Sequence, residues 1–316
     1  MPTGGLRPRS KSLCEELPKK LTNRPLDRSV PQLPRASAGA GSPLNLSAAS
    51  FLPVFKRHKP RCEYKYQISV AQIPLLKQAI EPYCEIDPFV AGQGRYTITS
   101  LYLDTPRRDL YWATENQRHS RMKLRIRTYG QHSEGPVFLE IKRRFGDAQS
   151  KSRVQVPRDQ WRWAVEPGGL EKARQWGLDA KKWSIVEDFA AQVAGWGLEP
   201  VCCVRYDRDP YVGVLNPDIR ITFDQAIRTI GCRDFELHAE DRDYQPVDYP
   251  FAFDAYDPRL VLEVKFDMRY PIWLIDLVRH FHLKREAFAK YCRSVDRLEG
   301  DLVRHRTDER GSRWEP

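Results

Sequence analysis

The chain has 316 residues, 41% of them hydrophobic and 11% aromatic, a composition typical of a soluble globular protein with one large or two small domains. No apolar run reaches the roughly 20 residues that a membrane helix needs, and no charged leader followed by an apolar segment marks a secretory signal. The seven cysteines lack Cys-x-x-Cys spacing, which argues against a zinc site or a disulfide framework and favours reduced thiols in the cytoplasm.

The positive charge is unevenly distributed. The formal net charge is +10, but residues 1–60 hold 11 Lys and Arg against 3 acidic residues, whereas the rest holds 41 against 39. Residues 1–55 are rich in Pro, Ser and Ala without a sustained period, so we expect a disordered basic tail there, a globular domain over 56–300 and a polar tail over 301–316. A solvated tail is the plainer interpretation; binding of nucleic acid, an anionic membrane or polyphosphate is the alternative.

The first half of the domain mixes strands with short helices. Strands are predicted where β-branched and aromatic residues alternate with polar ones, and helices where apolar residues recur every three or four positions. In chain order we expect a strand at 61–69, a helix over 71–83, a strand at 96–104, a helix over 108–115, and strands at 120–129, 136–144 and 151–156.

The second half begins with a helical region over 157–196. Its large aromatic residues are expected to form core against the outside of the sheet; they are Trp161, Trp163, Trp176, Trp183, Phe189 and Trp196. Further strands are predicted at 201–214, 219–224, 226–230, 244–249 and 259–267. Two helices follow, one beginning at Pro271 and one over 284–298.

The segment 121–129 carries a cation at every second position, namely Arg121, Lys123, Arg125 and Arg127. Because successive strand side chains point to opposite faces, one face is cationic and the other largely apolar. A charged face that simply meets water is the plainer interpretation of one such strand. The pattern recurs, however, in the strands that contain Glu63-Tyr-Lys65, Glu140-Ile-Lys142, Lys151-Ser-Arg153, Arg220-Ile-Thr222-Phe-Asp224 and Glu263-Val-Lys265.

A sheet with so many charges on one face would repel itself unless an anion or a metal lay between the strands. If the sheet curls into an antiparallel barrel, the apolar faces pack under outer helices and the charged faces line a lumen. We therefore predict an α+β fold whose basic lumen, with its few carboxylates, binds a polyanion and a divalent cation.

Phosphoryl transfer suits such a lumen, because it needs phosphates positioned, their charge neutralised and a divalent metal between them. Arginine offers bidentate donors to phosphate oxygens, and lysine a point charge. By residue type the candidates are Arg125, Arg127, Lys142, Lys151, Arg153, Arg208 and Arg220, with Lys123 on the same cationic strand. Glu263, Glu140 and Glu63 are candidate metal ligands; alternatively, each pairs only with a neighbouring Lys or Arg.

Other chemistries lack their motifs. The chain contains no P-loop, no Rossmann glycine fingerprint after a strand, no His-Glu-x-x-His and no Gly-x-Ser-x-Gly, so the corresponding nucleotide, zinc and serine-hydrolase sites are not expected.

Nine short motifs in sequence order resemble the VTC domain, the catalytic domain of the vacuolar transporter chaperone polyphosphate polymerase and its bacterial relatives. They are Glu-x-Lys-Tyr (63–66), Ser-Leu-Tyr-Leu-Asp (100–104), Lys-Leu-Arg-Ile-Arg-x-Tyr (123–129), Glu-Ile-Lys (140–142), Lys-x-Arg (151–153), Tyr-Asp-Arg-x-x-Tyr (206–211), Ile-Arg-Ile-Thr-Phe-Asp (219–224), Leu-Glu-Val-Lys (262–265) and Phe-Ala-Lys-Tyr (288–291). The resemblance covers residues 56–298.

The resemblance implies the triphosphate tunnel fold, an antiparallel eight-stranded barrel with helices packed outside. It also implies transfer of the γ-phosphate of ATP onto inorganic polyphosphate with Mn²⁺ or Mg²⁺, and no dedicated nucleic acid partner. The residues that would grip the triphosphate or the chain are Lys65, Arg125, Arg127, Lys142, Arg208 and Arg220, together with Lys151 and Arg153. Glu263 would hold the metal, and Lys265 and Lys290 would line the tunnel.

One departure narrows the expected activity. Hydrolytic and cyclase members of the tunnel superfamily carry Glu-x-Glu-x-Lys on the first strand, whereas Arg61 stands at the first of these positions here. Thiamine-triphosphatase or adenylate cyclase activity is therefore disfavoured. A tripolyphosphatase or nucleoside triphosphatase on the same fold, and a polyphosphate-binding module without activity, remain alternatives to the polymerase.

Overall fold

The computed structural model describes residues 62–90, 94–130, 135–237, 241–247, 259–267 and 269–300. The chain divides into two units, Met1–Pro53 and Val54–Pro316, and every described residue belongs to the second. The predicted tails at 1–55 and 301–316 lie outside the described residues, as does Arg61.

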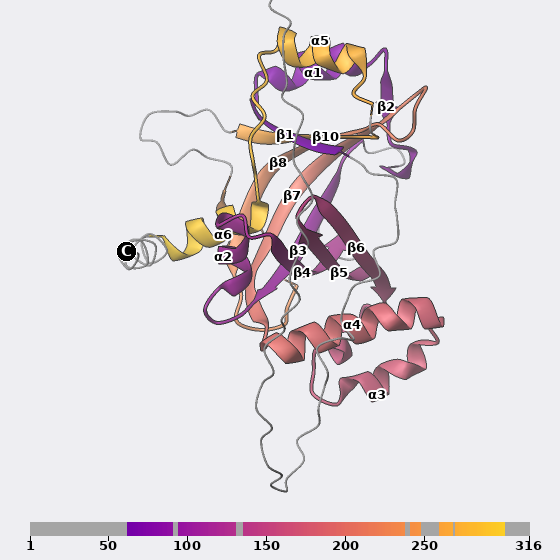
Figure 1. Cartoon of the computed structure of the whole chain (residues 1–316), viewed down its shortest axis with the longest axis vertical. Coiled ribbons are helices and arrows are strands. Elements are labelled where there is room, and N and C mark those ends of the chain that lie inside the picture. The colour runs from indigo at the N-terminus through magenta and orange to yellow at the C-terminus, as the bar shows by residue number, and fades with distance from the viewer. Residues whose placement is uncertain are drawn as a thin grey trace, which may run out of the picture. The chain divides into compact units, whose positions relative to one another are not determined.

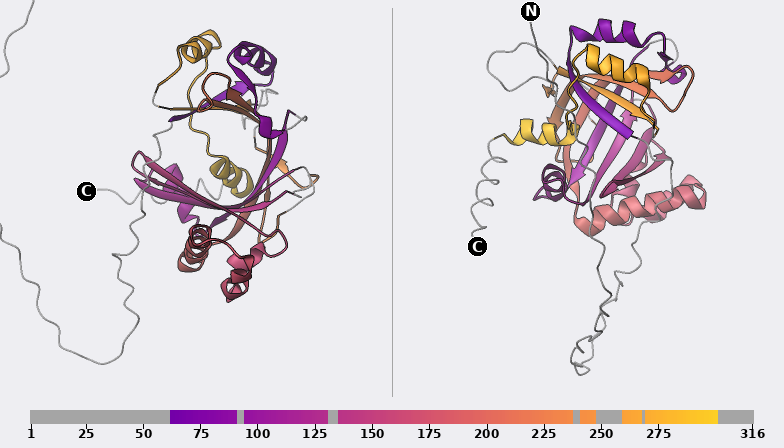
Figure 2. Two further views of the ribbon diagram at one scale, coloured as in Figure 1. Left: turned by 90° about the vertical axis from the view of Figure 1, so that its right-hand side faces the viewer. Right: turned by 45° about the horizontal axis from the view of Figure 1, so that its top comes forward.

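The described unit is built on one antiparallel sheet that curls into a half-barrel (Figures 1 and 2). Its eight principal strands lie in the order β1-β10-β8-β7-β3-β4-β5-β6, which confirms the predicted α+β class and the eight-stranded antiparallel sheet. Their bounds are β1 Cys62–Ser69, β3 Tyr96–Asp104, β4 Ser120–Tyr129, β5 Val137–Phe145, β6 Ala148–Val156, β7 Glu199–Gly213, β8 Arg220–Gly231 and β10 Arg259–Phe266. Two short strands flank it: β2 (Cys84–Ile86) pairs with β7, and β9 (Gln245–Pro246) with β8.

A two-residue turn sets the register of β5 against β6. Phe145 lies opposite Ala148, so Gly146 and Asp147 alone connect the strands, and Gly146 has a φ of 56°. A left-handed first residue is what the favoured hairpin turn requires, because its twist matches that of the strands. The register then continues along the sheet and places Glu140 between Arg125 of β4 and Arg153 of β6.

Four helices cover the convex side of the sheet, as predicted. α1 (Gln72–Ile80) and α5 (Ile272–His280) lie side by side over β1, β10 and β8 (Figure 2). α3 (Gly169–Ala173) and α4 (Ala180–Trp196), with the 3₁₀ turns Trp161–Ala164 and Arg174–Trp176, cover β4, β5 and β6. In both places the apolar half of each alternating strand supplies the core, and Leu124, Leu139 and Ile221 are fully buried there.

The last helix packs on the other side of the sheet. α6 (Lys290–Glu299) lies within the curve of the half-barrel (Figure 2), and α2 (Asp109–Glu115) packs against α6, β3 and β4. Tyr291 and Val295 of α6 are buried in one cluster with Val204, Tyr206 and Val261 of the strands. At this end the residues on the concave face are apolar rather than charged, so α6 can pack against them. The helix then fills part of the lumen.

Two predicted boundaries were wrong. β8 runs without interruption from Arg220 to Gly231, because a register shift against β7 and a positive φ at Ala226 absorb the irregularity that suggested two strands. The last helix begins at Lys290 rather than at 284, since the preceding segment runs along the edge of β1, where Glu286 N donates to Lys65 O at 3.0 Å. β2 was not predicted.

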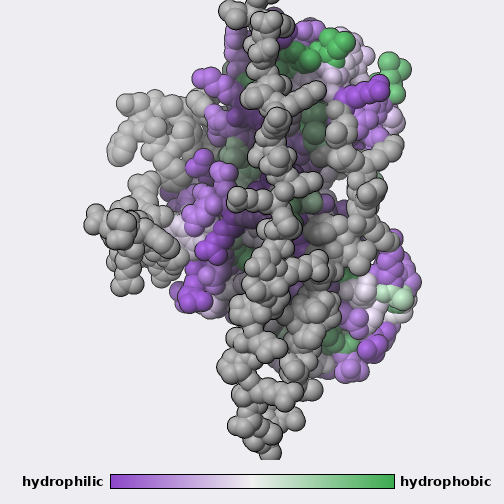
Figure 3. Space-filling view, in the orientation of Figure 1, coloured by the Kyte–Doolittle hydropathy of each residue, from purple (hydrophilic) through white to green (hydrophobic). Residues whose placement is uncertain are grey.

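The longest described helix, α4, has 17 residues, and none of the described helices combines the length and apolar character of a membrane span. Where described residues are visible in Figure 3, most are hydrophilic, and apolar atoms gather at the end that carries α1 and α5. Leu75 of α1 and Ile272 of α5 are among the exposed apolar side chains, at 56% and 77% exposure.

Candidate polyanion-binding site

The strand registers place the predicted site residues on one face of the sheet. Lys65 lies opposite Glu263, Arg208 opposite Asp224, and Arg125 opposite Glu140. This is the concave face of the sheet, and α6 packs on the same face. Thirteen of the fourteen predicted residues are on these strands, and Lys290 reaches the same face from α6; the cations are Lys65, Lys123, Arg125, Arg127, Lys142, Lys151, Arg153, Arg208, Arg220, Lys265 and Lys290.

Glu140 is the centre of one cluster, on β4, β5 and β6. Its carboxylate is 2% exposed and lies 2.7 Å from Arg125, 3.9 Å from Arg127, 3.0 Å from Lys151 and 3.4 Å from Arg153. Burial raises the pKa of Glu140, but Arg125, Arg127 and Lys151 outweigh it and hold that pKa well below its ordinary value. Glu140 therefore stays ionised and fixes the cations that face the lumen.

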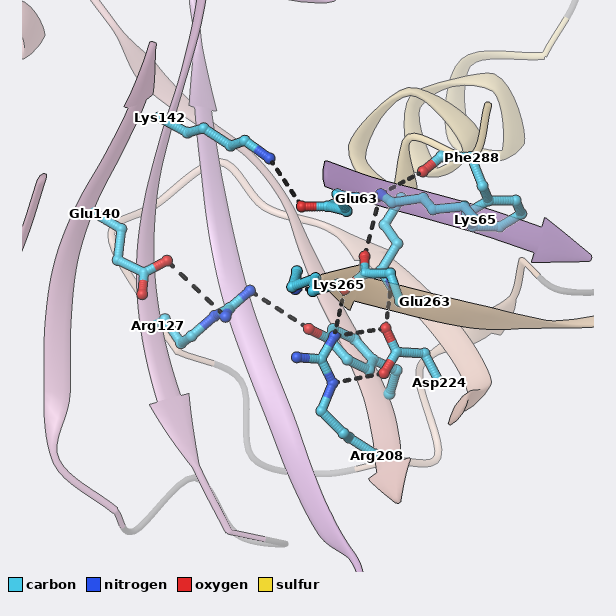
Figure 4. A network of polar contacts seen from close by, with 12 residues as sticks. Glu63, Lys65, Arg127, Glu140, Lys142, Arg208, Asp224, Glu263, Lys265 and Phe288 are labelled. Atoms are coloured by element: carbon cyan, nitrogen blue, oxygen red, sulfur yellow. Dashed lines mark hydrogen bonds and ion pairs between the residues drawn. The ribbon is translucent and has the colours of Figure 1, made fainter. Parts of the chain in front are cut away.

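Glu263 is the centre of a second cluster, on β1, β10 and β7 (Figure 4). One carboxylate oxygen lies 3.2 Å from Lys65 Nζ, and the other lies 2.8 Å from Lys265 Nζ and 3.5 Å from Arg208. Burial raises the pKa of Glu263, but Lys265, Lys65, Lys290 and Arg208 hold it well below its ordinary value. This carboxylate is therefore charged near neutral pH.

Asp224 is a site residue that sequence reasoning missed. It is fully buried and accepts from Arg208 Nε and Nη2 at 2.6 and 2.7 Å and from Lys290 Nζ at 2.6 Å. Its position was readable, since it shares a strand face with Arg220. Its pairing with Lys290 was not, because the two residues are 66 positions apart in the chain and the pattern of the strand does not indicate which helix residue it meets.

Two aromatic hydroxyls were also missed. Tyr102 OH accepts from Arg125 at 3.0 Å and Tyr206 OH from Arg127 at 3.4 Å, while Arg127 Nε also donates to Ser100 Oγ at 3.1 Å. Tyr102 lies between Leu101 and Leu103 and Tyr206 between Arg205 and Asp207, and neither context marks a tyrosine as a partner of arginine. The two tyrosines hold the two guanidinium groups in place.

Glu63 links the two sides of the lumen. Its carboxylate lies 3.4 Å from Lys65 on β1 and 3.7 Å from Lys142 on β5, so it reaches from the first strand to the opposite wall (Figure 4). Arg220 lies opposite Lys265 on the neighbouring strand, is half exposed and pairs with Asp87 at 3.2 Å rather than with Glu263. Of the predicted residues, Arg220 is therefore the one that the structure leaves at the rim.

Positive charge exceeds negative charge on this face. Of the eleven predicted cations, Arg220 pairs with Asp87, and the other ten face four carboxylates, Glu63, Glu140, Asp224 and Glu263, which leaves a surplus of six. Lys123 makes no hydrogen bond or ion pair with any described residue, and burial holds its pKa below its ordinary value. Burial, together with Arg125 and Arg127, lowers the pKa of Lys151 to about 8 despite Glu140. Such cations are stabilised when a polyanion binds among them.

The carboxylates fit a divalent metal that is shared with phosphate. Among the described residues, no group of three or more His, Cys, Asp and Glu side chains converges. Glu63 and Glu263, however, both lie within 3.4 Å of Lys65, and Mg²⁺ or Mn²⁺ commonly takes one or two carboxylates and completes its shell with phosphate oxygens and water. Glu140 and Glu263 are each surrounded by cations, so a metal at either carboxylate would share it with these ion pairs.

A curled antiparallel sheet with a basic concave face of this kind defines a triphosphate tunnel fold. Residues 60–299 match the model of the VTC domain, and the chain belongs to that family. No curated protein matches the chain.

Several solved structures are similar at low identity. One is a candidate adenylate cyclase from Vibrio parahaemolyticus, with a TM-score of 0.36 and 13% identity, covering 74% of this chain and 96% of that one. The PH1819 protein of Pyrococcus horikoshii is similar with a TM-score of 0.38 and 13% identity, and the match covers 75% of this chain and 99% of that one. A third is a candidate adenylyl cyclase from Hippeastrum, which is described as having a dominant triphosphatase activity. Its TM-score is 0.42 and its identity 15%, and the match covers 74% of this chain and 94% of that one. At these scores the likenesses carry no argument about activity.

Proposed function

We propose that this protein is an inorganic polyphosphate polymerase, which transfers the γ-phosphate of ATP to the end of a growing polyphosphate chain. Membership of the VTC domain family supports this proposal. So does the surplus of cations on the concave face, which matches a ligand that carries about one negative charge per internal phosphate. The observation that carries the proposal is that all four carboxylates on that face are paired with cations and have lowered pKa values.

Each of these carboxylates is held by at least two cations. Glu63 contacts Lys65 and Lys142, and Asp224 contacts Arg208 and Lys290; Glu140 and Glu263 each lie among more. Burial and Glu263 raise the pKa of Glu63, but the neighbouring lysines outweigh them, so its pKa is lowered. Carboxylates with lowered pKa values are poor general bases.

Because none of these four carboxylates is a good general base, a phosphate acceptor is favoured over water. Water must lose a proton to attack, whereas the terminal oxygen of a polyphosphate is already ionised near neutral pH, as for a phosphate group with a second pKa of about 6. Catalysis of phosphoryl transfer then consists of positioning and charge neutralisation. The concave face supplies both.

In the proposed reaction, an oxygen of the chain's terminal phosphate forms a bond to the γ-phosphorus, the bond from that phosphorus to the bridging β–γ oxygen breaks, and ADP leaves. Arg125 and Arg127, held by Glu140 and by the hydroxyls of Tyr102 and Tyr206, bind phosphate oxygens from one wall. Lysines and arginines around Glu263 bind from the other; they are Lys65, Lys265, Arg208 and Lys290.

Glu263, assisted by Glu63, is the proposed ligand of Mn²⁺ or Mg²⁺. Held by these carboxylates, the metal would supply positive charge against the negative charge that develops on the phosphate in the transition state. Lys142, Lys151, Arg153 and Lys123 are proposed to hold the chain further along the tunnel, and Arg220 to contact it at the rim. The cytoplasmic location, and the division into a tail at 1–55, a domain at 56–300 and a tail at 301–316, stay predictions.

The test is to incubate the purified protein with ATP and Mn²⁺ or Mg²⁺ and to resolve the products by gel electrophoresis and ³¹P NMR. A ladder of chains longer than triphosphate is expected, with ADP released in step. Orthophosphate without chain growth would assign the protein to the tripolyphosphatases or nucleoside triphosphatases. Binding of ATP and polyphosphate without turnover under either metal would make it a binding module.

A further inference from the structure

A small cavity lies among the cations of the Glu263 cluster. Its volume is about 130 Å³, and its lining includes Tyr96, Arg208, Arg220, Thr222, Glu263 and Lys265. Pockets for ligands of drug size hold about 300–1,000 Å³, and one water needs roughly 10–15 Å³. The cavity therefore has room for a phosphate group and a few waters, and none for a nucleoside.

Thr222 lines this cavity, and its hydroxyl is unpaired among the described residues. The residue is 8% exposed, and its Oγ1 is buried without a hydrogen-bond partner among the described residues. A buried hydroxyl that lacks a partner destabilises a fold. Native proteins contain few such groups, and each requires an explanation.

The neighbours of Thr222 explain why the hydroxyl is left over. Thr222 lies opposite Glu263 on β10 and opposite Pro210 on β7. Lys65 lies at one oxygen of Glu263, and Lys265 and Arg208 lie at the other, while proline has no N–H that could donate to the hydroxyl. The β-branched side chain has few rotamers, so the hydroxyl cannot easily turn to another partner.

We propose that Thr222 is a further binding residue of the tunnel, whose hydroxyl donates a hydrogen bond to a non-bridging oxygen of a phosphate group in this cavity. The inference rests on the proposed function for the identity of the ligand as a polyphosphate. Arg208, Arg220 and Lys265 supply the positive charge around the same group. A neutral donor adds direction without adding charge, which suits a site that must release its phosphate as the chain advances.

The test compares Thr222→Val, which replaces the hydroxyl by a methyl group, with Thr222→Ser, which keeps it. Tripolyphosphate and orthophosphate are titrated into each protein by calorimetry without metal, and the Tm of the unliganded proteins is measured. Thr222→Val is expected to bind tripolyphosphate about tenfold more weakly, as for the loss of one hydrogen bond to a charged group, and Thr222→Ser within about twofold of wild type. The unliganded Tm of Thr222→Val should equal or exceed that of wild type.

Thr229→Val is the matched control. Thr229 is fully buried on the same strand, but its Oγ1 donates to Cys203 O at 3.0 Å. This variant should lower the Tm and leave the affinity unchanged, so it reports what a merely structural hydroxyl does.

The proposal is overturned if Thr222→Val binds tripolyphosphate like wild type, or if its Tm falls as far as that of Thr229→Val. Failure of the wild type to bind either anion also overturns it. Its fate is separable from that of the polymerase: weaker binding in Thr222→Val, with no chain growth by the wild type, would retain the phosphate site and reject the polymerase.

Discussion

Replacing Asp224 by Asn should destabilise the protein far more than an ordinary surface change. Asp224 is fully buried and pairs with Arg208 and Lys290, which are 13% and 9% exposed. Breaking a buried ion pair costs about 3–5 kcal/mol, because it leaves uncompensated charge. Asn retains one acceptor oxygen, so a loss of about 3 kcal/mol is expected, out of a total stability of roughly 5–15 kcal/mol.

For a domain of this size, a loss of about 3 kcal/mol lowers the Tm by roughly 6–12 °C. The assay is thermal and urea unfolding followed by circular dichroism at pH 7. Burial raises the pKa of Asp224, but Arg208 and Lys290 outweigh it and lower the pKa overall. The stabilisation is therefore complete above the ordinary Asp pKa of about 3.9 and is lost as the pH falls through the lowered value.

Asp207→Asn is the matched control on the neighbouring strand. Asp207 is 23% exposed, accepts from Thr97 Oγ1 at 2.7 Å and lies 3.8 Å from Arg228, so its loss should be about 1 kcal/mol or less. Adding Lys290→Met to Asp224→Asn removes a buried cation that has lost its carboxylate partner, and this double variant should recover part of the stability. Equal losses of unfolding free energy for Asp224→Asn and Asp207→Asn would refute the argument that the buried ion pairs of Asp224 stabilise the fold.

Three further predictions concern binding and turnover. Arg125→Ala should weaken tripolyphosphate binding roughly 10- to 150-fold, since it removes charge-assisted hydrogen bonds. Arg121→Ala, whose side chain donates to Arg118 O at 2.9 Å, should change the affinity less than threefold, and calorimetry compares the two variants. Glu263→Gln should abolish metal-dependent turnover while metal-free binding of tripolyphosphate persists; full activity with Mn²⁺ would contradict the metal assignment. Because the pKa of Lys151 is lowered to about 8, wild-type affinity should fall as the pH rises from 7 to 9.5, and Lys151→Arg, which stays charged, should remove much of that fall; identical pH profiles would exclude Lys151 as the cause.

Much of the concave face could be predicted from alternation alone. Lys123, Arg125 and Arg127 share a strand face whatever the fold, because side chains two residues apart point the same way. The same rule places Glu140 with Lys142, and the structure confirms the shared face through the cross-strand pairs Arg125–Glu140 and Lys123–Lys142. Pairing of each glutamate with neighbouring cations, kept as the alternative to metal binding, is present in the structure.

The sequence by itself therefore determined the two-faced strands, since alternation is a local property of the extended chain, and their nine motifs determined the family. Only the tertiary structure decided which cation each carboxylate holds. Lys290 meets Asp224 because α6 packs inside the curve of the sheet, and Thr222 is left unpaired because register sets it beside Glu263 and Pro210. Register and helix docking depend on burial of apolar surface between segments far apart in the chain, and no local pattern encodes that burial.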